Sequence, residues 1–297
     1  MTLTSEDVKA AFPKEKTKAF NLPINEALLS EALQQLNRMI GMDQVKSEIN
    51  KLVTLVRFYK EEGRTLADLS PHTLLIGSPG TGKTEVARII VKIYEALGVL
   101  ERGDLVEVNR DKLVSAYPGE GERLIAGYID QAMGGTLFID EAYQLTQYGA
   151  QDPGHKVVEI LLKRMEDDRG KFIVIVAGYK EKMEPFLDSN DGLRRRFFRR
   201  IEFADYTQAE LMQISELMFQ EKGYQLDPKA RETLLAYYES VYKNRDHTFG
   251  NAGLARNIVN ESIKNLDYRI AKIAKEKRTQ EAMKTILAED IRLATEK

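Results

Sequence analysis

Residues 77–84 of the chain read Gly77-Ser78-Pro79-Gly80-Thr81-Gly82-Lys83-Thr84. They match the pattern G-x-x-x-x-G-K-[ST] in full. The apolar run HTLLI precedes them and the helix-periodic run EVARIIVKIYEALG follows them. Glycines let the backbone N–H groups of such a turn converge on phosphate oxygens, and the following helix adds its positive N-terminal end. A chance glycine-rich surface turn is the alternative, and the strand-turn-helix context favours a phosphate-binding loop instead.

Two carboxylates after a second apolar run complete this interpretation. Residues 137–141 read Leu-Phe-Ile-Asp-Glu, and a buried strand there would deliver Asp140 to the carboxyl edge of the sheet, where the phosphate loop also lies. Lys83 then supplies a cation to the β- and γ-phosphates, while Thr84 and Asp140 offer oxygens to Mg²⁺. Glu141 is placed to orient and deprotonate the attacking water. An Asp-Glu pair taken alone commonly just starts a solvated loop.

The order of the expected elements predicts the fold class. Strands alternate with helices of ten or more residues as far as Tyr206, which indicates a doubly wound parallel α/β sheet with helices on both faces. After Thr207 the patterns are helical almost throughout. We therefore expect a helical, partly disordered N-terminal segment over residues 1–35, an α/β nucleotide-binding domain over 36–206 and a small all-helical lid domain over 207–297. Asn25 is expected to cap a helix that runs to Met39.

Composition excludes several classes of site. The 297 residues include 44 Lys+Arg and 46 Asp+Glu, and the resulting net charge of −2 argues against general attraction to nucleic acid or anionic lipid. There is no cysteine, so disulfides and thiolate chemistry are excluded, and three well-separated histidines argue against a multi-histidine metal site. No apolar run reaches the roughly 18 residues of a membrane span, and the N-terminus lacks a secretory signal pattern. We expect a cytoplasmic protein.

The arginine run over residues 194–196 has two interpretations. Most such runs are solvated basic faces. The alternative is an arginine finger that enters a neighbouring subunit's active site and stabilises charge on the transferring phosphoryl group. A finger supplied in trans requires a head-to-tail contact, and repeated contacts of that kind close into a ring.

Taken together, these residues resemble the AAA+ ATPase superfamily, with GSPGTGKT and LFIDEA as its Walker A and Walker B signatures. Within it, the chain is similar to the group that contains stage V sporulation protein K-like ATPases and CbbX, the red-type rubisco activase. The phrases that carry this resemblance run from about Leu36 onward: MIGMDQVKSEI, AMGGTLFIDEAYQL, IVIVAGYKEKM, GLRRRFFRRIEFADYT and FGNAGLARNIV. The resemblance implies bound ATP and Mg²⁺.

The resemblance also implies site residues beyond the two carboxylates. The implied nucleotide-binding set is Ile40, Gly41, Ser78, Pro79, Gly80, Thr81, Gly82, Lys83, Thr84, Glu85, Asp140 and Arg256. Ile40 and Gly41 would line the adenine pocket. Tyr117, Pro118 and Gly119 occupy the place of the first pore loop, where an exposed aromatic residue grips a polypeptide. Local packing of Tyr117 under its own loop is the alternative. The stretch 148–154 would lie near the second pore loop.

Two positions depart from the superfamily pattern. Tyr179 stands where many members carry a polar sensor-1 residue, and we count it with Lys83 and Glu141 among the catalytic residues. Gly253 stands where the related pattern carries the sensor-2 arginine; Arg256, three residues on, is a candidate substitute. For the finger we favour Arg194 and Arg196, which correspond to the two arginines of the CbbX-type pattern.

The expected function is an ATP-hydrolysing, Mg²⁺-dependent ring motor, hexameric by resemblance, that remodels a protein client as a chaperone. The client is rubisco by analogy with CbbX, although sporulation and secretion ATPases share the architecture. The alternative is a nucleotide-gated assembly or scaffold ATPase with slow hydrolysis and no threading, an alternative that the Gly253 departure keeps open. A DNA-loading ATPase is a third hypothesis, against which the near-neutral charge argues.

Overall fold

A parallel five-stranded sheet forms the centre of the larger part of the molecule. The computed structural model describes residues 22–64, 71–115, 117, 119–149, 151–246 and 249–296. All strands of this sheet are parallel, in the order β2-β3-β4-β1-β5. Their bounds are β1 (Thr73–Gly77), β2 (Leu105–Val108), β3 (Thr136–Ile139), β4 (Ile173–Gly178) and β5 (Arg199–Phe203). The doubly wound fold predicted from the alternation of strands and helices is confirmed.

Burial of the inner strands explains their composition. Every residue of β1, β3 and β4 is buried, as expected for parallel strands that are covered on both faces. Side chains alternate between the two faces, so that Leu75 packs on one face while Leu74 and Ile76 pack on the other. Because the strands run the same way, the loops after Gly77, Ile139 and Gly178 gather at one carboxyl edge.

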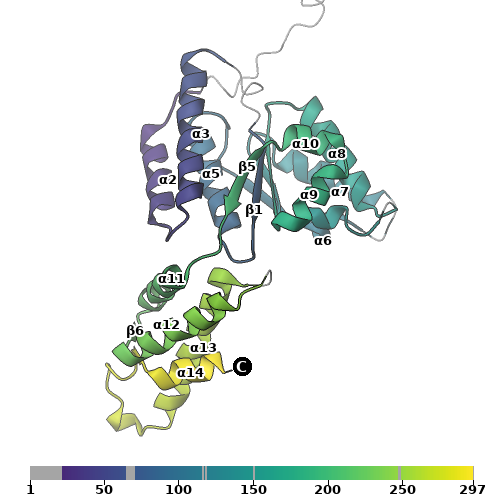
Figure 1. Cartoon of the computed structure of the whole chain (residues 1–297). Coiled ribbons are helices and arrows are strands. Elements are labelled where there is room, and N and C mark those ends of the chain that lie inside the picture. The colour runs from purple at the N-terminus through teal and green to yellow at the C-terminus, as the bar shows by residue number, and fades with distance from the viewer. Residues whose placement is uncertain are drawn as a thin grey trace, which may run out of the picture.

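Helices cover the two faces of this sheet (Figure 1). One face is covered by helices whose apolar stripes share a core with Leu75 and Phe138. These are α2 (Glu26–Arg38), α3 (Asp43–Glu61) and α5 (Lys83–Ala96). The other face is covered by α7 (Glu120–Gln131), α8 (Gly154–Asp167), α9 (Lys180–Asp188) and α10 (Asp191–Arg196), with the short α6 (Arg110–Leu113) and the 3₁₀ turn η2 (Ala142–Leu145) at its rim.

The C-terminal part is a separate helical body with its own core (Figure 1). It contains α11 (Gln208–Glu221), α12 (Pro228–Lys243), α13 (Asn251–Ala271), the 3₁₀ turn η3 (Lys275–Lys277) and α14 (Ala288–Thr295). Thr207 and Glu210 form a capping box that begins α11 directly after the last strand of the large sheet. The two-residue strands β6 (Gln225–Leu226) and β7 (Thr285–Ile286) pair in parallel beside it.

The local predictions are confirmed at some helix ends and wrong at others. Asn25 caps α2, since its side-chain oxygen accepts a hydrogen bond from the N–H of Leu28 at 3.1 Å. The sequence pattern predicts a helix over Arg123–Met133, but α7 begins at Glu120, directly after Gly119 in the left-handed conformation (φ 79°). The short helices α6, α9 and α10 were not predicted, since each spans fewer residues than a reliable periodic pattern. Among the described residues, no helix is both long and apolar enough to cross a membrane.

Candidate nucleotide-binding site

A cleft of about 690 Å³ lies between the carboxyl edge of the sheet and the helical C-terminal part. The end of α2, the loop after β1, the end of β3 and the facing helices α11 and α13 all contribute to its wall. Eleven of the predicted site residues line it: Ile40, Pro79, Gly80, Gly82, Lys83, Thr84, Glu85, Asp140, Glu141, Tyr179 and Arg256. Segments more than 200 residues apart in sequence therefore meet at one site, as the phosphate-loop interpretation requires.

The loop after β1 is closed on itself by its own lysine. The Nζ atom of Lys83 donates hydrogen bonds to the carbonyl oxygens of Gly77 and Ser78, each at 2.8 Å. Gly80 and Gly82 have φ values of 69° and 88°, in the left-handed region that disfavours side chains. Burial lowers the pKa of the Lys83 ammonium, and the nearby carboxylates oppose that shift. The loop thus holds a largely desolvated cation where a phosphate would lie.

Thr81 and Ser78 stabilise the loop from its other side. The Thr81 hydroxyl is buried and donates to the Ser78 carbonyl at 2.8 Å. Neither residue lines the cleft; Ser78 lies on the outer side of the loop, beside Lys180 and Arg245. Their backbone amides remain part of the predicted phosphate cradle, while the Thr81 side chain and the Ser78 carbonyl shape the turn.

The paired carboxylates lie across the cleft from the lysine. Asp140 Oδ1 accepts the N–H of Glu141 at 3.0 Å, and Glu141 has a left-handed backbone (φ 49°) as the strand turns into η2. The Gln144 amide donates to the Glu141 carboxylate. Burial raises the pKa of the Asp140 carboxyl, and Lys83 partly offsets this. Two adjacent carboxylates with one cation nearby form an environment that favours a further positive charge.

The residues present fit a magnesium ion. Thr84 and Asp140 both line the cleft and offer hard oxygen donors. Mg²⁺ in proteins is usually bound through one or two carboxylates together with substrate phosphates, so a site of two protein oxygens is sufficient. The desolvated Asp140 carboxylate gains most from such an ion, because burial disfavours its unpaired charge.

Tyr179 lines the cleft next to the lysine. Its ring centroid is 5.9 Å from the Nζ atom of Lys83 and 5.7 Å from the ring of Tyr143. Lys182 Nζ lies over both rings, 4.8 Å from Tyr143 and 5.1 Å from Tyr179. Burial raises the pKa of the Tyr179 hydroxyl, so it stays a protonated hydrogen-bond donor at neutral pH. Tyr179 therefore places a neutral hydrogen-bond donor beside the phosphate loop.

Apolar residues form another part of the cleft wall. Ile40 is joined there by residues that the sequence did not single out, namely Met39, Tyr206, Ile214 and Leu217. Ile214 and Leu217 are three residues apart on α11, so they share one face of that helix. That spacing was visible in the sequence, but nothing in it distinguished a face toward the cleft from a face toward the helical core. Gln35 and Arg38 at the end of α2 also line the cleft and were missed.

Gly41 contacts the helical part rather than the cleft. A Cβ atom at Gly41 would lie 2.0 Å from the carboxylate of Glu210, and the residue has φ 63°. The residue therefore permits close packing of the linker against the start of α11. Its predicted contact with adenine is not seen in the lining of the cleft, because the linker presents Ile40 there instead.

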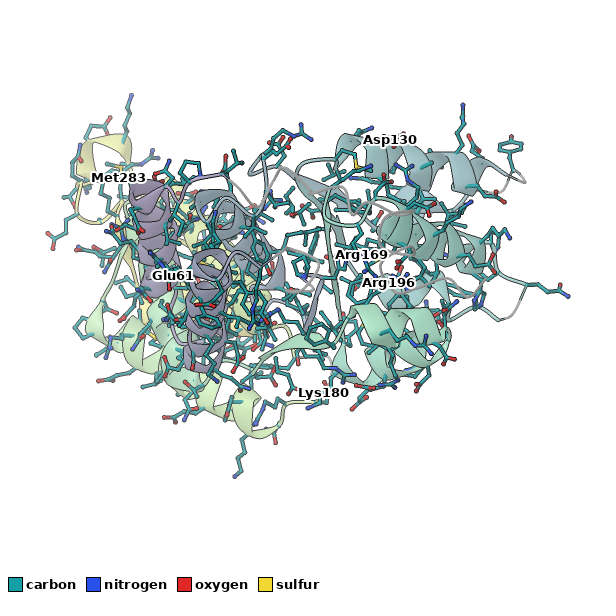
Figure 2. The ribbon with its side chains drawn as sticks, turned by 90° about the horizontal axis from the view of Figure 1, so that it is seen from above. Glu61, Asp130, Arg169, Lys180, Arg196 and Met283 are labelled. Carbon is teal, nitrogen blue, oxygen red and sulfur yellow. The ribbon has the colours of Figure 1, made fainter. Side chains whose placement is uncertain are left out.

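The arginine run lies far from this cleft. The residue pairing Thr73↔Arg199 places the start of β5 beside the start of β1, at the amino edge of the sheet. Arg194 pairs with Asp188 at 2.6 Å and with Glu184 at 3.1 Å. Arg196 and Arg169, close together in Figure 2, both bind Glu166. The chain thus carries its phosphate loop and its arginines at opposite edges of one sheet.

The predicted pore residues lie on the rim beyond β2. Tyr117 is 74% exposed, so the local-packing alternative for its side chain is wrong. Gly119 has open space around its Cα, and Pro118 lies outside the described residues. Tyr148 is exposed as well, and the Arg110 guanidinium lies 4.5 Å from its ring centroid. This contact places the predicted second pore loop beside the start of α6. The segment that carries the predicted first pore loop follows α6 in the chain.

Comparison with known families divides the chain into two matches. Residues 73–205 match the model of the ATPase family associated with various cellular activities, and residues 207–297 match the AAA lid domain. The ESX-3 secretion system protein EccA3 of Mycobacterium tuberculosis (strain ATCC 25618 / H37Rv) is 38% identical over 82% of this chain and 41% of its own length. The chain therefore spans less than half the length of that relative.

Two further relatives match over most of their length. Stage V sporulation protein K of Bacillus subtilis (strain 168) is 34% identical over 87% of this chain and 79% of its own. The chloroplastic ribulose bisphosphate carboxylase/oxygenase activase of Cyanidioschyzon merolae (strain NIES-3377 / 10D) is 36% identical over 93% and 96%. Among solved structures, the FIGL-1 AAA domain in complex with ADP superimposes with a TM-score of 0.59 at 18% identity, over 100% of this chain and 91% of that one, which supports the fold.

Proposed function

The chain belongs to the AAA+ ATPase family, in the group of stage V sporulation protein K and the chloroplastic activase, and on that premise we propose that it is a ring-forming ATPase that remodels a protein client. One observation carries the proposal. Lys83, Thr84, Asp140 and Glu141 line a single cleft, although β3 lies more than 50 residues after the phosphate loop. A cation, two hard oxygen donors and a base in one site are what phosphoryl transfer to water requires.

Each residue has a part in the proposed hydrolysis. Lys83 exchanges its bonds to the Gly77 and Ser78 carbonyls for bonds to phosphate oxygens. Glu141 accepts a proton from the attacking water and is held for that task by its fixed backbone and by Gln144. Tyr179 donates a hydrogen bond toward the terminal phosphate. Mg²⁺, held by Thr84 and Asp140, would neutralise charge on the phosphate oxygens.

The position of the arginine run supports assembly into a ring. In a ring of head-to-tail contacts, the amino edge of one sheet can face the cleft of the next subunit. Arg194 and Arg196 are the proposed fingers. Their ion pairs with Glu184, Asp188 and Glu166 lie at the surface, where water screens such pairs and they contribute little, so that release toward a neighbour costs little. We propose six subunits, as the resemblance to CbbX implies.

Tyr117 carries the proposed contact with the client. An exposed aromatic side chain on a loop offers a large apolar contact that does not depend on the client's sequence. The relatives' names mention a carboxylase and a secretion system, so large protein assemblies are the class of client that we propose, ribulose bisphosphate carboxylase/oxygenase among them.

A nucleotide-gated scaffold is the second candidate, and Gly253 favours it. This residue lines the cleft but offers no side chain to a nucleotide, so the lid lacks one expected charged contact. Weak coupling between nucleotide and lid would suit slow hydrolysis with assembly as the output.

The test of the ATPase proposal is Glu141→Gln. This variant should bind ATP with an affinity within about threefold of the parent chain, while its turnover falls at least about 100-fold, since general-base catalysis contributes about 10²–10⁴. Glu159→Gln, on the exposed outer surface of α8, is the matched control. Unchanged turnover in Glu141→Gln would refute the assignment.

The same variant separates the two functions. Held in its ATP state, Glu141→Gln should retain the client during affinity capture. The captured protein is then the substrate for Tyr117→Ala, which should stop remodelling of that protein while ATP turnover in its absence continues. Remodelling that survives Tyr117→Ala would contradict the role proposed for Tyr117, whereas a parent chain that captures the protein without remodelling it would favour the scaffold.

A further inference from the structure

A fully buried asparagine joins the phosphate loop to the lid. Asn251, at the start of α13, is 0% exposed and has a left-handed backbone with φ 49°. Its Oδ1 accepts the N–H of Tyr206 at 2.9 Å. Its Nδ2 donates toward three acceptors: Asp205 Oδ1 at 2.9 Å, the carbonyl oxygen of Phe249 at 3.1 Å and the carbonyl oxygen of Pro79 at 3.2 Å. One side chain thus bonds the hinge at residues 205–206, the phosphate loop and the segment just before its own helix.

These bonds compensate for two unfavourable features. Burial of an amide without partners costs a few kcal/mol, and a left-handed backbone outside glycine costs about 1 kcal/mol or more. At Asn251 the first cost is met by partners for both the oxygen and the nitrogen of the amide. Asparagine is also among the residues that tolerate this backbone best. An apolar residue of similar size could fill the space but could not bond all three segments.

The neighbouring backbone makes a second connection. The N–H of Ala252 donates to the carbonyl oxygen of Gly80 at 3.2 Å. A Cβ atom at Gly80 would lie 2.3 Å from the carbonyl oxygen of Gly250, so only glycine permits this approach. The phosphate loop and the first turn of α13 therefore touch backbone to backbone. No side chain is interposed that could absorb a movement of either.

We infer that Asn251 is a positioning residue that sets the orientation of the lid according to the state of the phosphate loop. The amides of such a loop face the phosphate, so bound phosphate fixes the peptide planes of Pro79 and Gly80. Their carbonyl oxygens are the atoms that Asn251 and Ala252 bond. Nucleotide occupancy is thereby transmitted to α13 through hydrogen bonds, without a lid arginine at position 253. The effect on turnover rests on the proposed function; the effect on the lid does not.

The primary test measures the lid directly. The chain has no cysteine, so Lys163→Cys on α8 and Lys222→Cys after α11, both exposed, give a clean pair for distance measurement by spin labels, diluted into unlabelled chain. In the parent chain a non-hydrolysable ATP analogue should narrow and shift the distance distribution. Asn251→Gly removes the side chain and relieves the strain of the left-handed backbone. In this variant the affinity for the analogue should stay within about threefold of the parent chain's, while the distance distribution with the analogue should equal the distribution without nucleotide.

A reciprocal exchange separates coupling from folding. In Asn251→Asp with Asp205→Asn, the new amide at 205 can donate to the new carboxylate at 251, which still accepts from Tyr206. The donors to the carbonyl oxygens of Pro79 and Phe249 are lost, together with the 3.7 Å ion pair between Asp205 and Arg245. We expect its melting temperature to lie close to that of the parent chain and its lid response to be lost. For both variants the kcat of ATP hydrolysis should fall at least tenfold relative to the parent chain, while KM for ATP stays within threefold.

Three results would overturn the inference. They are a full lid response in Asn251→Gly, a full lid response in the reciprocal exchange, and, in the parent chain itself, unchanged hydrogen exchange at the amides of Tyr206 and Ala252 when the analogue binds. The last measurement needs no variant and so remains decisive if a substitution prevents folding. A parent chain that binds the analogue and moves its lid but never hydrolyses ATP would contradict the proposed function and leave this inference standing.

Discussion

The Nζ atom of Lys83 lies 2.8 Å from the carbonyl oxygen of Gly77, the last residue of β1. The lysine is thus already directed along the loop in which it will meet phosphate. Lys83→Ala should weaken ATP binding at least tenfold, since a charge-assisted bond to phosphate contributes about 1.5–3 kcal/mol. Isothermal titration calorimetry measures this, with Lys163→Ala on the exposed side of α8 as control. Equal affinities in the two variants would contradict the phosphate-loop assignment.

Asp140 should make the empty site less stable as pH rises. Burial raises the pKa of this carboxyl, so the folded chain holds the proton more tightly than the unfolded chain. The contribution of the group to stability is therefore present at low pH and is lost as pH rises through the folded-state pKa. Asp140→Asn should increase the free energy of unfolding without nucleotide at pH 8, by about 1 kcal/mol, and by less at pH 4.

Urea denaturation at the two pH values tests this prediction. The control is Asp267→Asn, an exposed position on α13 at which the exchange should change stability by less than about 0.5 kcal/mol. The same Asp140→Asn chain should lose Mg²⁺-dependent turnover. A variant that is destabilised at pH 8, or that keeps its turnover, would remove Asp140 from the proposed magnesium site.

The sequence predicts the residues that carry the chemistry of the site better than the other residues that line the cleft. Lys83 and Asp140 could be placed because a phosphate loop and a buried strand ending in a carboxylate both require the carboxyl edge of a parallel sheet. Tyr206 and Leu217 could not, because their position depends on how the helical part packs against that edge. The bonds of Asn251 were equally hidden: the FGNA phrase was visible, but its partners Pro79 and Asp205 lie 172 and 46 residues away.

Fold prediction fails where elements are too short to have a period. The alternation that indicates β1 and α5 extends over many residues, whereas α6 and α10 have four and six. The arginine run lies on α10, so its geometry could not be inferred. Successive residues of a helix point about 100° apart, and the structure accordingly gives Arg194 and Arg196 different acidic partners.

Loss of an arginine finger should slow ATP hydrolysis without weakening ATP binding. Arg194→Ala and Arg196→Ala should each reduce ATP turnover at least about 100-fold while leaving ATP affinity within threefold, since a finger stabilises the transition state. Arg195 is exposed and makes no ion pair with the described residues, so Arg195→Ala tests the register of the run. If Arg195→Ala alone abolishes turnover, the assignment moves to that residue.

Mixing variants tests whether the finger acts in trans. Rings made from equal amounts of Arg194→Ala and Lys83→Ala chains contain interfaces at which an intact phosphate loop meets an intact arginine. Turnover of the mixture should exceed that of either variant alone by several-fold. If turnover does not recover, Lys83 and Arg194 act in the active site of the same subunit. Their positions argue against this, because the phosphate loop follows the carboxyl end of β1 whereas α10 lies at the amino edge of the sheet.

Gly253 offers a way to add the missing lid contact. A Cβ atom there would meet nothing within 4 Å, and the residue lines the cleft, so Gly253→Arg can project a guanidinium toward the phosphates without displacing a neighbour. We expect ATP affinity to rise by about tenfold, the size of one charge-assisted hydrogen bond. Gly253→Gln is the control, because any side chain at this helical position stabilises α13 relative to glycine by about 0.5–1 kcal/mol.

The two lid contacts can be combined in one chain. If Asn251 transmits the state of the phosphate loop, Gly253→Arg should restore to Asn251→Gly the lid movement that it lost, because a direct bond from the lid to phosphate replaces the bond through Pro79. Gly253→Gln should not restore it. Spin-label distances with the non-hydrolysable analogue report both cases. Equal restoration by arginine and glutamine would show that helix stability, rather than contact with the nucleotide, controls the position of the lid.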